Sequence, residues 1–165
     1  MRAGNRKGRV ATVRYLFAWI TVAAAWGQTL QIPPAAVSRG SANLFRLIFT
    51  SAADRRVAAL QWELVIPQEL QIDTGSVVPG TAAEAAGKSI KCAGRTEPKT
   101  GKILTCILAG GADPIQDGAV AIVKFSAAGD AQRGVVTARI QKVIGVSVDL
   151  KKITIADAGG AITIR

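Results

Sequence analysis

Residues 60–72 constrain the fold of this chain more than any other segment. In the first half of this stretch, large apolar residues occupy every second position: Leu60, Trp62, Leu64 and Ile66. Successive side chains of a strand point to opposite faces, so this alternation predicts a strand with one face in the core. Pro67 cannot donate a hydrogen bond within a sheet and is expected to end the strand. A second extended piece is predicted over residues 70–78.

The rest of the chain repeats this pattern of short apolar stretches separated by turns. Further strands are predicted over residues 42–50, 89–95, 102–108, 119–127, 135–146, 153–156 and 161–164. Residues 81–87 form the one helix-like stretch, which is too short to be stable alone. Many short strands with regular turn signals and no long amphipathic helix predict an all-β sandwich or jelly roll.

The N-terminus has the order of a secretory signal peptide. Basic residues at positions 2, 6, 7, 9 and 14 precede an apolar run at residues 15–25, and Ala25 and Gly27 offer small residues for cleavage. The run is shorter than the roughly 18 to 20 apolar residues that a membrane span needs, which disfavours the alternative of an uncleaved anchor. We therefore expect residues 1–27 to be a signal peptide and residues 28–165 to form one domain, secreted to the periplasm or the extracellular space.

Removing the signal peptide changes how the charge is interpreted. The full chain carries a net charge of +10, and residues 1–27 contain five basic residues and no acidic one, which leaves +5. The remaining basic residues are scattered, so surface solvation explains them better than nucleic-acid binding, which needs clustered charge. No nucleic-acid partner and no stable membrane insertion after cleavage are expected.

The two cysteines, Cys92 and Cys106, are expected to form a disulfide, because export leads to an oxidising compartment. If they face each other across a hairpin, the centre of that hairpin falls at residue 99. A turn around Glu97, Pro98 and Gly101 is predicted independently from its proline, glycine and polar residues.

The composition argues against an enzyme. The chain has no histidine, which excludes histidine-based general-base catalysis and histidine metal ligands. The loop acids Asp113, Asp117, Asp130 and Asp157 lack the spacing of a calcium-binding loop, so no metal and no cofactor are expected. A carboxylate pair for glycoside hydrolysis is not excluded by spacing, but solvated surface acids are the better account.

Three segments together resemble a cohesin domain. These are residues 60–80 (LQWELVIPQELQIDTGSVVPG), 117–125 (DGAVAIVKF) and 157–165 (DAGGAITIR), and their order and spacing agree over roughly residues 42–165. The chain departs from the usual Tyr-Asp-Pro of the family's first turn, where Val65-Ile66-Pro67 keeps only the proline. A cysteine pair is also not a usual feature of the family.

This resemblance implies a flattened jelly-roll sandwich of about nine strands. It also implies a protein-binding role, in which one sheet face binds calcium-loaded dockerin modules. Such complexes are linked to polysaccharide use. A carbohydrate-binding module of similar fold, with a polysaccharide ligand, is one alternative, and a structural or adhesive cell-surface subunit is another. Exposure of Trp62 separates the first two, because sugar-binding faces use exposed aromatic rings; we expect Trp62 to be buried.

The resemblance to a cohesin domain also implies where a binding face lies. It is expected on the sheet formed by the strand at 60–66, the two strands of the cysteine hairpin and the strand at 135–142. Alternation predicts which side chains point outward from that sheet: Gln61, Glu63, Val65, Lys91, Ile103, Thr105, Ile107 and Arg139. An apolar patch with a polar rim suits partner recognition, and good strand propensity or cover by a loop is the alternative account of Ile103 and Ile107.

Overall fold

The computed structural model of the chain describes residues 27–52, 56–98 and 101–165. The predicted signal peptide lies outside these residues except for Gly27. The centre of the hairpin turn, residues 99 and 100, also lies outside them.

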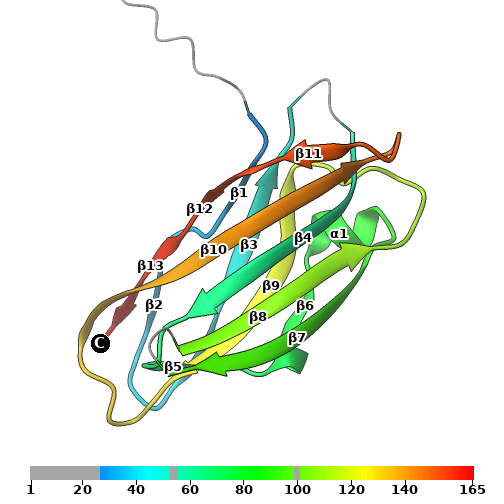
Figure 1. Cartoon of the computed structure of the whole chain (residues 1–165). Helices are drawn as coiled ribbons and strands as arrows, with labels where there is room; N and C mark the ends of the chain where they lie inside the picture. The colour runs from blue at the N-terminus through cyan, green and yellow to red at the C-terminus, as the bar shows by residue number, and fades with distance from the viewer. Residues whose placement is uncertain (1–26, 53–55, 99–100) are drawn as a thin grey trace, which may run out of the picture.

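Two β-sheets pack face to face, and Figure 1 shows the larger sheet in front of the smaller one. The smaller sheet contains β12 (Ala156–Ala158), β1 (Thr29–Gln31), β3 (Ala42–Thr50), β9 (Gly118–Ala127) and β5 (Leu70–Gln71) in that order, with β6 (Val77–Pro79) also paired to β9. The larger sheet contains β2 (Ala35–Val37), β13 (Gly160–Ile164), β10 (Gly134–Ser147), β4 (Val57–Ile66), β8 (Gly101–Ala109) and β7 (Ser89–Glu97), with β11 (Lys152–Thr154) paired to β10. The predicted β-sandwich is confirmed.

The core lies between the two sheets and contains the residues that alternation placed there. Trp62, Leu60 and Leu64 of β4 are at most 1% exposed. Phe49 of β3 is fully buried with them, and Phe45 lies 5.4 Å from Phe125 of β9, measured between ring centroids. The four aromatic side chains that follow residue 27 are therefore all in the core.

The structure divides the chain more finely than predicted. The described residues form 13 strands rather than about nine, because pieces of two or three residues complete the edges of both sheets. The continuous strand expected over residues 70–78 is wrong: it is interrupted after β5 by a 3-10 turn, Thr74–Ser76, before β6 begins. The turn forms because Ser76 donates its backbone N–H to the carbonyl of Asp73 at 3.0 Å.

The short helix is present as α1 (Thr81–Ala85), and it buries Ala82 and Ala83 against the start of β9. The hairpin of β7 and β8 has the predicted register, with Cys92 opposite Cys106 and Glu97 opposite Gly101. Gly101 adopts a φ of +88°, and a Cβ at this position would lie 2.3 Å from the carbonyl oxygen of Ile66. Only glycine fits such a close approach of two chains, so this residue fixes the end of the hairpin against the end of β4.

Candidate functional site

The candidate site is the outer face of the larger sheet, meaning the side of β10, β4, β8 and β7 that points away from the core. In Figure 1 these four strands lie next to one another across the front of the molecule. Strand register places their outward side chains in three rows: Arg139, Val65, Ile103 and Arg95; Gln141, Glu63, Thr105 and Ala93; and Ile144, Gln61, Ile107 and Lys91. The structure therefore brings all eight predicted binding residues onto one face.

Five of these eight residues are accessible. Gln61, Lys91 and Arg139 are exposed, Thr105 is half-buried, and Ile107 is 48% exposed. Ile107 lies between Gln61 of β4 and Lys91 of β7. An exposed aliphatic side chain between two polar neighbours is a small apolar contact point with a polar rim.

The other three residues face outward but are covered, which corrects the expectation that they are exposed. Glu63, Val65 and Ile103 are 7%, 4% and 3% exposed. Val65 and Ile103 lie directly opposite each other, with Arg139 on one side and Arg95 on the other. The aliphatic part of an arginine side chain covers apolar neighbours while its charged end stays in water. These two residues thus form a small satellite cluster outside the main core.

Glu63 is the polar centre of the outer face and receives hydrogen bonds from three side chains. Gln141 Nε2 donates to its Oε2 at 2.8 Å, and Arg95 Nη1 donates to its Oε1 at 3.2 Å. Lys142 Nζ lies 3.2 Å from both carboxylate oxygens. Arg95 also pairs with Glu97 at 3.2 Å. The cluster joins β10, β4 and β7, with Glu63 and Gln141 in the row next to the covered Val65–Ile103 pair and Arg95 beside Ile103.

The hydrogen bond from Gln141 is the largest cause of a change in the pKa of Glu63. Burial alone would raise this pKa, but Gln141, Arg95 and Lys142 together lower it from 4.5 to about 2. The pKa of Arg95 is raised, mainly by its hydrogen bond to Glu63. Glu63 is therefore ionised and already neutralised by its neighbours, so it stabilises the sheet and presents little free charge to a partner.

Lys142 reaches Glu63 because β10 contains a bulge. Gln141 pairs with Glu63 and Ile144 pairs with Gln61, so Lys142 and Val143 together oppose Trp62. Lys142 has a φ of +53°, and Val143 packs against the core in its place. A bulge re-aims side chains in this way. Without it, Lys142 would point inward.

Arg95 and Lys142 were not among the predicted site residues. The sequence holds a signal for the second one. With Ala138 and Ile140 inward, strict alternation assigns a lysine to the next core position, which is costly for a charged group. Two adjacent apolar residues, Val143 and Ile144, follow it. A charge in a core position followed by an apolar pair indicates a bulge.

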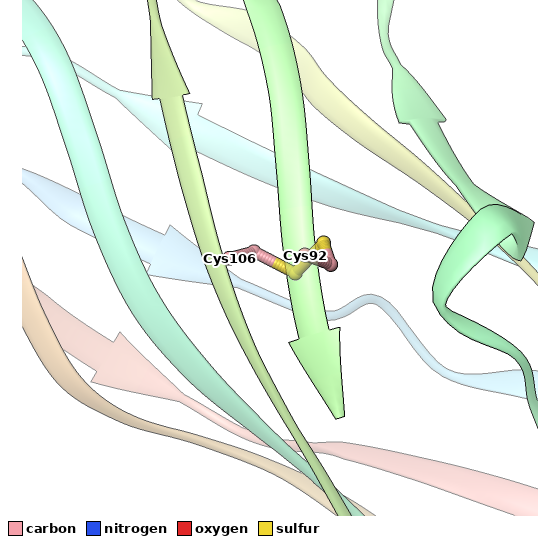
Figure 2. Close-up of a disulfide and its surroundings, with 2 residues drawn as sticks. All are labelled: Cys92 and Cys106. Atoms are coloured by element: carbon pink, nitrogen blue, oxygen red, sulfur yellow. A yellow bond between two sulfur atoms is a disulfide. The ribbon is translucent and has the colours of Figure 1, made fainter. Parts of the chain in front are cut away.

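The predicted disulfide joins the inward sides of β7 and β8, directly beneath the outer face (Figure 2). Cys106 is fully buried and Cys92 is half-buried. Because β7 is an edge strand of the larger sheet, the disulfide and the β8 ladder hold it in place. The positions of Lys91 and Arg95 on the outer face depend on this attachment.

The described residues do not offer the features expected of a sugar-binding face. Trp62, Phe45, Phe49 and Phe125 are at most 3% exposed, so no ring in this part of the chain is available for stacking on a sugar. An open cleft of about 560 Å³ lies at the end of the sandwich near Gln71, Asp73, Lys102 and Lys124. Phe125 contributes to its lining but is 3% exposed.

Within residues 27–52, 56–98 and 101–165, no three histidine, cysteine or acidic side chains lie close enough together to hold a metal ion. Over the same ranges, no helix is long and apolar enough to cross a membrane.

Comparisons with solved structures match this chain to cohesins. A non-cellulosomal cohesin from the archaeon Archaeoglobus fulgidus is 17% identical, with a TM-score of 0.66 over 84% of this chain and 91% of that one. The cohesin in a type I cohesin–dockerin complex from Clostridium thermocellum is 12% identical, with a TM-score of 0.69 over 84% and 99% of the two chains. A second cohesin–dockerin complex from that organism gives 15% identity and a TM-score of 0.62 over 96% and 99%.

No protein-family model and no curated protein matches the sequence. At these identities the structural matches establish the fold, and the chain has the cohesin fold. Fold alone does not fix function, which depends on the site built upon it.

Proposed function

We propose that this chain is an exported, non-catalytic protein-binding module whose outer face binds a dockerin-like partner. The observation that carries this proposal is the outer face itself. It combines an exposed aliphatic residue, Ile107, with charged side chains that are held by hydrogen bonds around Glu63. Preorganised polar groups around an apolar contact point lose little freedom on binding, which favours recognition of a partner.

Two facts support a protein as the ligand. Structures with the same fold include cohesins bound to dockerin modules. The four aromatic residues after residue 27 are buried, which removes the stacking platform that a carbohydrate-binding module would need. A role in polysaccharide use would then be indirect, through the partner that this module recruits.

The experiment measures binding of dockerin modules from the source organism by calorimetry, with calcium and with a chelator. We expect saturable binding only in calcium, and loss of most of the affinity in an Ile107→Ser, Arg139→Ser double variant. The matched control is Leu44→Ser, Lys124→Ser. Leu44 is 37% exposed and lies opposite Lys124 on the outside of the smaller sheet. Binding to insoluble polysaccharide, with no binding to any dockerin, would contradict the proposal and favour a carbohydrate-binding module.

Export is tested separately, by sequencing the N-terminus of the released protein. The proposed signal peptide predicts a first residue near Gln28, because Ala25 and Gly27 form the small-residue cleavage site. A product that retains Met1 and sediments with membranes would contradict this part of the proposal.

A further inference from the structure

The turn between β10 and β11 carries a leucine in a backbone conformation that does not suit it. Leu150 donates its N–H to the carbonyl of Ser147 at 3.0 Å, and Ser147 donates its N–H to the carbonyl of Lys151 at 2.9 Å. Leu150 has a φ of +59°. This is a short hairpin loop whose last residue is left-handed, a position where glycine or asparagine is favoured.

Packing does not explain the leucine either. Its side chain is 86% exposed, so it gains almost nothing from the core. A bulky residue at positive φ is a genuine outlier, and such outliers cluster at functional sites. Glycine would fit this backbone better, and a polar residue would fit this exposure better. Neither the backbone conformation nor burial therefore accounts for an apolar side chain at position 150.

The surroundings of Leu150 are basic. Arg56, Lys151 and Lys152 are exposed and, with Asp149, line a recess of about 340 Å³ beside the turn. Val148 donates its N–H to the carbonyl of Arg56 at 3.0 Å, which ties the chain before β4 to this turn. Ser147 Oγ accepts the N–H of Lys151 at 3.1 Å and is itself 8% exposed, so the turn is rigidly braced. We call Leu150, Arg56, Lys151 and Lys152 the leucine tip.

We propose that the leucine tip binds anionic phospholipid surfaces, with Leu150 inserted between headgroups and the three basic side chains at headgroup level. Basic residues near an anionic leaflet each contribute attraction, and apolar side chains add insertion energy. Long basic side chains keep their charged ends at the interface while their stems follow the apolar residue.

A bilayer fits this feature better than a protein partner does. A stable protein interface buries on the order of 800 Å² on each side, whereas the tip is one projecting turn with a single exposed large aliphatic. A fluid lipid surface closes around such a tip without needing a complementary socket. Figure 1 shows the β10–β11 turn at one end of the sandwich, past the end of β10, while the outer face lies along its side. Lipid and a protein partner could therefore bind at the same time.

The test uses vesicles of phosphatidylcholine with and without phosphatidylglycerol, and the protein as it is released after export. We expect the protein to co-sediment with the anionic vesicles at low salt and to be displaced at high salt, where charges are screened. Leu150→Gly suits the left-handed backbone, so its thermal midpoint should not fall, while its vesicle affinity should drop by about tenfold through the lost insertion. Lys151→Gln, Lys152→Gln should lower the affinity by roughly 25-fold, at about fivefold per charge.

The matched control is Lys91→Gln, Lys124→Gln. It removes the same charge, once from the outer face and once from the outside of the smaller sheet, and should leave vesicle binding nearly unchanged. Three outcomes would overturn the proposal. They are failure of the unmodified protein to sediment with anionic vesicles, sedimentation of Leu150→Gly equal to that of the unmodified protein, and a loss of binding in the control pair as large as in the tip pair. The first outcome would leave an acidic protein as the partner of the tip. Dockerin binding by Leu150→Gly reports separately on the proposed function.

Discussion

The side-chain nitrogen of Lys142 lies 3.2 Å from both carboxylate oxygens of Glu63, although strict alternation along β10 would turn Lys142 toward the core. The bulge at Lys142 and Val143 makes this contact possible. It completes a set of donors around a carboxylate that is 7% exposed. A buried charge is tolerated when it is paired and hydrogen-bonded, and Glu63 meets both conditions.

Glu63 should make the free energy of unfolding depend on pH in the acid range. Its pKa is lowered from 4.5 to about 2 by Gln141, Arg95 and Lys142, so its contribution is fully present above pH 4.5 and is lost as the pH falls through about 2. If the whole pKa shift contributed to the free energy of unfolding, it would be worth about 3 kcal/mol. Because Arg95 and Lys142 are exposed to solvent, which screens their charges, we expect roughly 1 to 2 kcal/mol. Urea unfolding of the unmodified protein and Glu63→Gln should show a difference in unfolding free energy that shrinks below pH 4.5.

The control for this measurement is Glu84→Gln, in the exposed first turn of α1. It should change the unfolding free energy by no more than about 0.5 kcal/mol at any of these pH values. A difference between the unmodified protein and Glu63→Gln that stays constant from neutral to acid pH would show that Glu63 acts by packing and not by charge.

The left-handed backbone at Lys142 predicts an unusual order of substitutions. Lys142→Gly relieves a conformation that costs roughly 1 to 2 kcal/mol for a residue with a side chain, and it loses an exposed ion pair worth at most about 1 kcal/mol. Its unfolding free energy should therefore be equal to that of the unmodified protein or slightly higher. Lys142→Val loses the ion pair and places a β-branched residue at positive φ, which should cost about 2 kcal/mol. If glycine proved as damaging as valine, the bulge would not have this conformation in solution.

Much of the sandwich could be predicted because its signals are local. Alternation placed Trp62 in the core, and the turn residues between Glu97 and Gly101 placed the hairpin, which the disulfide register confirms. The continuous strand predicted over residues 70–78 failed although its interruption is also local. Ser76 donates its N–H to the carbonyl of Asp73, and this segment contains Asp, Gly and Ser, which favour turns.

For the candidate site, the sequence predicted which way the side chains point but not which of them are exposed. Alternation correctly turned Val65 and Ile103 away from the core, but they are only 4% and 3% exposed, and strand pairing places Arg139 and Arg95 beside them. Exposure is a property of neighbours across the sheet, so it cannot be read from one strand. The role of Lys142 was missed because a bulge shifts the phase of alternation, and the prediction assumed a regular strand.

The disulfide should contribute substantially to stability. Cys92 and Cys106 are 14 residues apart, and closing a loop of about 15 residues is worth about 3 kcal/mol in the chain-entropy model. A reductant should lower the urea midpoint of the unmodified protein and have no effect on Cys92→Ala, Cys106→Ala. Two free thiols in the non-reduced exported protein would contradict the bridge.

Ile103 and Ile107 lie on the same strand and face the same way, yet they should respond in opposite ways to substitution by serine. Ile103 is 3% exposed, so Ile103→Ser removes buried apolar atoms and should lower the unfolding free energy by about 2 to 4 kcal/mol. Ile107 is 48% exposed, so Ile107→Ser should cost less than about 1 kcal/mol and act mainly on partner binding. Urea unfolding and calorimetry with a dockerin module, both run on each variant, separate the two effects. A folded Ile107→Ser that binds as tightly as the unmodified protein would move the contact point away from this part of the outer face, whereas a stable Ile103→Ser would show that the arginines flanking it do not cover it in solution.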